Sequence, residues 1–264
     1  MTGRFGKLEV QQTAAAVRAE QDPRTLGTPV RTPAHDLRMA DEACRTGCFE
    51  TALQLHTHAL RSDRALVPAW VGQVQMLVEL GEYPEARLWA DKALELFKNN
   101  GELLAAKAQA CVRAGSHDAA TECTDASMQS PGSSAYRWRV RAEVLLRHTA
   151  ERARDCFEKS LAEPGTDWFD RVQIARAYLF HGRPAPAVPY AQAAVDLQPG
   201  SAYAWLVLGR CFASNGMAER AASAFEKSIQ LPGGKVDAQA ALTELRSSGR
   251  ASHLLKRIGG LFQR

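Results

Sequence analysis

Six alanines recur along this chain at an almost constant interval: Ala52, Ala86, Ala120, Ala153, Ala187 and Ala221. The intervals are 34, 34, 33, 34 and 34 residues. A glycine stands five residues before each alanine except Ala153. A fixed period of this length is typical of stacked repeats, in which each unit is one supersecondary element. The period therefore constrains the fold more than the composition does.

Small side chains also recur in the first half of the repeats, at Ala40, Ala108, Ala142, Ala175 and Gly209, with Val74 as the exception. Two helices that cross closely leave no room for a bulky side chain between them. The glycine between the two small positions favours a helix end, because it adopts a left-handed conformation without strain. Prolines follow at Pro164, Pro199 and Pro232, where a second helix must stop. Each repeat is predicted to be two antiparallel helices.

This pattern resembles the tetratricopeptide repeat, a helix–turn–helix unit, over about residues 33–235. The resemblance implies an all-α, right-handed superhelical solenoid whose first helices line the inner face. Six repeats are expected, at 33–66, 67–100, 101–134, 135–167, 168–201 and 202–235. A largely extended segment at 1–32 is expected before them, followed after the repeats by a capping helix at 236–248 and a basic amphipathic tail at 249–264.

Local departures predict distortions of individual repeats. The fourth repeat is one residue short and has Arg147-His148-Thr149 where the turn glycine is expected, which predicts a tighter or distorted turn. Prolines in the fifth repeat predict that its second helix begins near Ala185–Pro186 or is kinked. The tryptophans at the fourth position of their repeats are expected to be buried anchors: Trp70, Trp138 and Trp205. The capping helix is expected to face the sixth repeat with Val236, Ala238, Ala241, Leu242 and Leu245.

No catalytic residue, cofactor site or metal site is predicted. The chain has no nucleophile elbow, phosphate-binding loop or two-histidine metal helix. Its six cysteines lack the paired spacing of a zinc site and suit buried, reduced fillers. Because no apolar run approaches 18 residues and the basic amino terminus precedes no apolar segment, a cytoplasmic protein is expected.

The net charge of +4 is concentrated at the carboxyl-terminal end. From Lys235 onward there are six basic and two acidic residues, so the rest of the chain is neutral. Specific nucleic-acid binding is not predicted, because it requires many cationic contacts along a surface.

The inner face of the last three repeats is the predicted partner-binding groove. It combines aromatic and arginine side chains: Tyr136, Arg139, Arg147, Phe169, Arg176, Tyr203 and Arg210. Aromatic faces beside guanidinium groups suit an extended peptide with acidic or carboxy-terminal groups. In the alternative interpretation, the arginines pair with Glu143 and neighbouring acids and only solvate the groove. The leading hypothesis is a non-enzymatic scaffold or adaptor that binds a protein or peptide partner.

The tail is the second candidate binding segment. Its docking residues form an apolar stripe with basic flanks: Leu254, Leu255, Lys256, Arg257, Ile258, Leu261 and Phe262. A basic amphipathic helix suits an anionic membrane or a protein groove. Three alternatives stay open: a membrane-peripheral assembly factor, a self-assembling solenoid in which the tail fills a second copy's groove, and a tail without a docking role.

Overall fold

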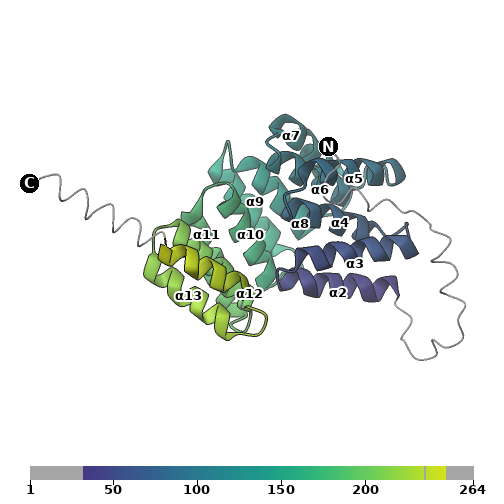
Figure 1. The fold of residues 1–264 in the computed structure, drawn as a ribbon. Helices are drawn as coiled ribbons and strands as arrows, with labels where there is room; N and C mark the ends of the chain where they lie inside the picture. The colour runs from purple at the N-terminus through teal and green to yellow at the C-terminus, as the bar shows by residue number, and fades with distance from the viewer. Residues whose placement is uncertain (1–31, 235, 248–264) are drawn as a thin grey trace, which may run out of the picture. The chain divides into compact units, whose positions relative to one another are not determined.

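The computed structural model describes residues 32–234 and 236–247, and in these ranges it contains helices but no strand (Figure 1). The helices follow one another in antiparallel pairs, as the repeat predicts. Their bounds are α2 Pro33–Arg45, α3 Phe49–Ser62, α4 Val67–Glu79, α5 Tyr83–Leu96, α6 Gly101–Arg113, α7 His117–Gln129, α8 Ala135–Leu145, α9 Ala150–Ala162, α10 Trp168–Phe180, α11 Pro184–Leu197, α12 Ala202–Ser214 and α13 Ala218–Gln230. Residues 236–247 form a further helix, which we call the terminal helix. The expected extension at 1–32, apart from its last residue, and the expected tail at 249–264 lie outside the described residues.

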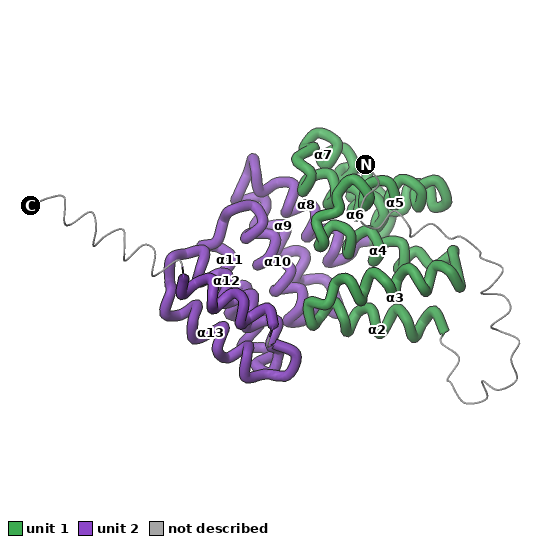
Figure 2. Tube along the Cα trace, viewed as in Figure 1, with its two compact units in different colours: residues 1–132 green, residues 133–264 purple. Residues whose placement is uncertain are grey.

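The chain divides into two compact units, residues 1–132 and 133–264 (Figure 2). Helices α2 to α7 belong to the first unit, and α8 to α13 with the terminal helix belong to the second. Within each unit every first helix packs on its own second helix, as α6 does on α7 and α12 on α13. First helices of neighbouring repeats also contact one another, as α4 contacts α6 and α10 contacts α12. This is the predicted all-α repeat architecture.

The repeated small residues lie at the helix crossings. All six alanines that define the period have no exposed surface. At Gly209 of α12, an added Cβ would lie 2.4 Å from Cε1 of Phe225 on α13. At Gly72 of α4, it would lie 2.2 Å from Cε1 of His56 on α3. These distances are shorter than any real carbon contact, so only glycine allows the two helices to approach this closely.

Glycines with positive φ end most of the first helices. Gly81, for example, has φ of 82°, and its N–H donates to the carbonyl of Val78 at 3.1 Å. The fourth repeat lacks this glycine, and its first helix α8 has 11 residues where α10 has 13. The N–H of Thr149 instead donates to the carbonyl of Leu145 at 2.9 Å. The repeat that lacks the glycine and is one residue short thus has the shorter first helix.

Three repeats close their helix pair with a serine hydroxyl. Ser127, Ser160 and Ser228 each donate from the second helix to the carbonyl of the first residue of the preceding helix. The acceptors are Gly101, Ala135 and Ala202, at 2.7, 2.7 and 2.8 Å. We call these contacts the serine bridges. Because the three hydroxyls are at most slightly exposed, these hydrogen bonds replace lost contacts with water.

Helix α11 begins at Pro184, next to the expected start. A proline in the first turn costs no hydrogen bond, because the first four backbone N–H groups of a helix have no partner inside it. Pro189 lies inside the helix and removes one hydrogen bond there.

Tryptophans near the start of first helices donate hydrogen bonds to the loop that precedes the helix. Nε1 of Trp70 donates to the carbonyl of Arg64, and Nε1 of Trp205 donates to that of Pro199, both at 2.9 Å and six residues back. Trp70 is 7% exposed, as predicted for an anchor. The expectation that Trp138 and Trp205 are buried anchors was wrong, because both side chains are partly exposed.

The terminal helix packs through fewer residues than predicted. Ala238 is fully buried and Leu242 is 7% exposed, but Val236 is 80% exposed. Val236 is the first described residue of the helix, before the turn that contacts the body of the unit. Its predicted burial was therefore wrong.

Candidate functional site

The predicted groove residues come from three successive first helices of the second unit. Tyr136 and Arg139 lie on α8, and Arg176 and Tyr203 lie on α10 and α12. The guanidinium carbon of Arg139 is 5.2 Å from the centroid of the Tyr136 ring, and its Nη1 is 3.8 Å from Oδ1 of Asp170 on α10. Arg139 is therefore engaged within the protein, by a cation–π contact and a long ion pair.

Arg176 is engaged in a similar way. Its guanidinium carbon lies 6.0 Å from the centroid of the Tyr203 ring, and its Nη1 donates to Oε1 of Gln173 at 3.2 Å. Tyr203 is only 7% exposed. These two side chains thus connect α10 to α12, and Tyr203 offers little open aromatic surface.

The remaining groove residues differ in their accessibility. Phe169 is partly exposed and makes an edge contact with Trp168, with ring centroids 5.6 Å apart. Arg147 is exposed in the turn after α8, because that helix ends before it. Glu143 is 1% exposed, and its Oε1 lies 3.3 Å from Nε2 of His181.

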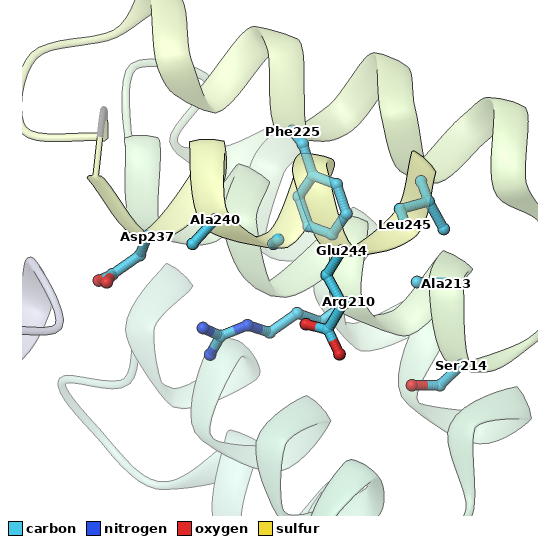
Figure 3. A pocket seen from close by; sticks show the side chains of 9 residues that line it. Arg210, Ala213, Ser214, Phe225, Asp237, Ala240, Glu244 and Leu245 are labelled. Atoms are coloured by element: carbon cyan, nitrogen blue, oxygen red, sulfur yellow. The ribbon is translucent and has the colours of Figure 1, made fainter. Parts of the chain in front are cut away.

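Arg210 lines a cleft at the carboxyl-terminal end of this row of first helices. The cleft has a volume of about 490 Å³ and lies between α12, α13 and the terminal helix. Figure 3 shows the side chains of Arg210, Asp237 and Glu244 at this cleft, with Ser214 and Leu245 farther along it. Arg210 is exposed and makes no hydrogen bond, ion pair or ring contact with residues 32–234 or 236–247.

The 34-residue period relates three charged side chains of this face. Arg176, Arg210 and Glu244 are each 34 residues apart, so they occupy the same turn and the same side of α10, α12 and the terminal helix. At these equivalent positions, the two arginines of α10 and α12 are therefore followed by a glutamate on the terminal helix. Sequence reasoning counted Asp237 and Glu244 only toward the net charge, although the period could have placed Glu244 beside Arg210.

The described part of the chain also bears on metal sites and on membrane-spanning helices. In it, no cluster of three or more histidine, cysteine, aspartate or glutamate side chains is arranged to hold a metal ion. None of its helices combines the length and the apolar character needed to cross a bilayer. Of the six free cysteines, Cys48 is exposed and Cys123 is partly exposed, so only the other four fit the expectation of buried fillers.

A family model described as tetratricopeptide repeat matches residues 172–235, which include α11, α12 and α13. The same helix pair recurs from α2 onward with its crossing alanines buried. Residues 172–235 are therefore similar to the tetratricopeptide repeat family, and the described helices have the fold of stacked helical repeats. Comparison with curated proteins gave no match.

Solved structures share this fold. A tetratricopeptide repeat protein from Parabacteroides merdae is 19% identical with a TM-score of 0.53, and the match covers 88% of this chain and 89% of that one. Human IFIT1, as a dimer with m7Gppp-AAAA, is 16% identical with a TM-score of 0.57 over 88% of this chain and 62% of that one. A chain of the APC/C hetero-tetramer Cut9-Hcn1 is 14% identical with a TM-score of 0.51, and the match covers 81% of this chain and 43% of that one. At these identities the likenesses show the fold alone.

Proposed function

We propose that this protein, which is similar to the tetratricopeptide repeat family, is a non-enzymatic scaffold that binds an extended peptide of a partner protein along α8, α10 and α12. Tetratricopeptide repeat proteins bind protein or peptide partners in general. The observation that carries the proposal is Arg210, an exposed arginine in an open cleft that makes no hydrogen bond, ion pair or ring contact with any described residue.

The cleft suits a peptide because it offers a cation beside apolar surface. Arginine presents five N–H donors in a planar fork that matches a carboxylate, and the bidentate geometry adds direction to the charge attraction. Ala213 and Leu245 supply apolar surface in the same cleft. Beside the cleft, Arg139 and Arg176 already lie against the rings of Tyr136 and Tyr203. Their guanidinium groups therefore lose little conformational freedom when a peptide binds to this face.

Charge reversal at Arg210 tests the proposal. Affinity capture from the source lysate, read by mass spectrometry, is compared for the wild type, Arg210→Glu and Arg152→Glu. Arg152 is an exposed arginine of the same unit on the second helix α9, away from the cleft, so its reversal is the matched control. Arg176 is not used, since its contact with Tyr203 joins two helices.

The proposal expects a partner that is recovered with the wild type and Arg152→Glu but lost with Arg210→Glu. Circular dichroism checks that all three proteins keep their helix content. Equal recovery of every partner by the three proteins would rule out this face as the binding surface.

A further inference from the structure

We infer that the cleft between α12 and the terminal helix selects a peptide that carries an acidic and a basic side chain about three residues apart. The acidic side chain binds Arg210, and the basic one binds Glu244. This inference rests on the proposed function and adds the charge pattern of the partner.

The first step is the separation of charges inside the cleft. Arg210, Asp237 and Glu244 all line it, yet neither carboxylate lies within ion-pair distance of the guanidinium group. No hydrogen bond or ion pair joins any of the three side chains to the described part of the chain. The cleft therefore presents both signs of charge to whatever enters it.

The second step is the spacing between the charges. Arg210 and Glu244 occupy equivalent positions on neighbouring helices, and packed helix axes lie about 8–10 Å apart. A peptide in the extended polyproline II conformation advances about 3.1 Å per residue with three residues per turn, so side chains three residues apart lie about 9 Å apart on the same side of the peptide. A peptide that crosses the helices thus brings side chains about three residues apart over Arg210 and Glu244.

The third step is the surface between and beside the charges. Ala240 and Ala241 of the terminal helix line the cleft, and their small side chains leave room for a peptide backbone. Asp237 precedes Glu244 by seven residues, which is about 10 Å along the same side of the helix. The terminal helix therefore presents two carboxylates, which attract a lysine or arginine and repel a second acidic side chain.

Blocked ten-residue peptides with a fluorescent label test the inference by anisotropy on the full chain. The first peptide carries Glu-x-x-Lys, and the second has the same composition with the two charges eight residues apart. The third carries Glu-x-x-Glu, and the spacer residues are serine and leucine in all three. The first peptide is expected to bind about fivefold tighter than the second, because only it engages both partly exposed charges at once.

The variant Glu244→Lys tests whether Glu244 binds the basic side chain of the peptide. It is expected to reverse the preference, so that Glu-x-x-Glu binds more tightly than Glu-x-x-Lys. Glu219→Lys makes the same charge change at an exposed position of α13 outside the cleft, and it should keep the wild-type order. Circular dichroism confirms that both variants are folded.

The outcomes separate this inference from the function on which it rests. If the wild type binds the first and second peptides equally, or prefers Glu-x-x-Glu, the charge pattern is wrong while a peptide site remains. If Glu244→Lys still prefers Glu-x-x-Lys over Glu-x-x-Glu, Glu244 does not bind the basic side chain of the peptide and the inference is wrong. If none of the peptides binds, the inference fails, and the lysate experiment on Arg210 separately decides the proposed function.

Discussion

The buried imidazole of His56 predicts that the first unit loses stability in mild acid. His56 lies on α3 with 8% of its surface exposed, and its ring covers Gly72 of α4. Burial lowers its pKa from 6.5 to about 4, although the nearby carboxylate of Asp41 acts in the opposite direction. Nδ1 of the ring has no hydrogen-bond partner in the described part of the chain. The folded protein therefore holds His56 neutral.

The sign of the effect follows from proton binding. Between pH 6.5 and about 4 the unfolded chain protonates His56 while the folded chain does not, so acid favours unfolding. The full stabilisation of the neutral ring is present above pH 6.5. For the cited pKa values the loss amounts to about 2 kcal/mol at pH 5 and about 3 kcal/mol at pH 4.

Urea unfolding followed by circular dichroism, at pH 7.5 and pH 5, measures this loss. The comparison is between the wild type and His56→Leu, which fills the site with an apolar side chain that does not titrate. The wild type should lose about 2 kcal/mol more than the variant between the two pH values. The same loss in both proteins would show that His56 is protonated in the folded state and that the reasoning from burial is wrong.

Two further predictions concern packing and use the shift in the urea midpoint as the measurement. Gly209→Ala should cost about 1–3 kcal/mol because its Cβ would enter the ring of Phe225. Gly200→Ala, which meets nothing within 4 Å, should be close to neutral, and equal effects of the two changes would contradict the crossing geometry. Trp70→Ala should cost about 3–5 kcal/mol, since its indole is buried and hydrogen-bonded. Trp205→Ala should cost about half as much because its ring is partly exposed, and a larger loss than for Trp70 would refute this ranking.

The fold could be predicted because its determinants repeat in the sequence. The residue at each helix crossing must be small, as Ala187 is, and this requirement returns with every repeat. Single features without such repetition were less predictable. Trp205 occupies the same position in its repeat as Trp70 and makes the same hydrogen bond to the preceding loop, but Trp70 also has the ring of Trp89 5.9 Å away.

The surroundings of the proposed binding face could be predicted only in outline. The period placed Arg139, Arg176 and Arg210 on equivalent helices, but it could not tell which of them are engaged internally. That difference arises from Asp170 and Tyr203, which belong to neighbouring helices and meet the arginines only after stacking. Arg210 is left accessible at the end of the row.

The serine bridges bear on how the protein folds. Each joins residues only 25 or 26 positions apart, so a hairpin can close before any distant part of the chain arrives. Folding dominated by such short-range contacts is fast and can nucleate in several places. Ala59 and Ala93 replace the serine in the first two hairpins, which therefore close without this hydrogen bond. Amide hydrogen exchange should therefore be faster in α3 and α5 than in α7, because the hairpins with alanine open more often.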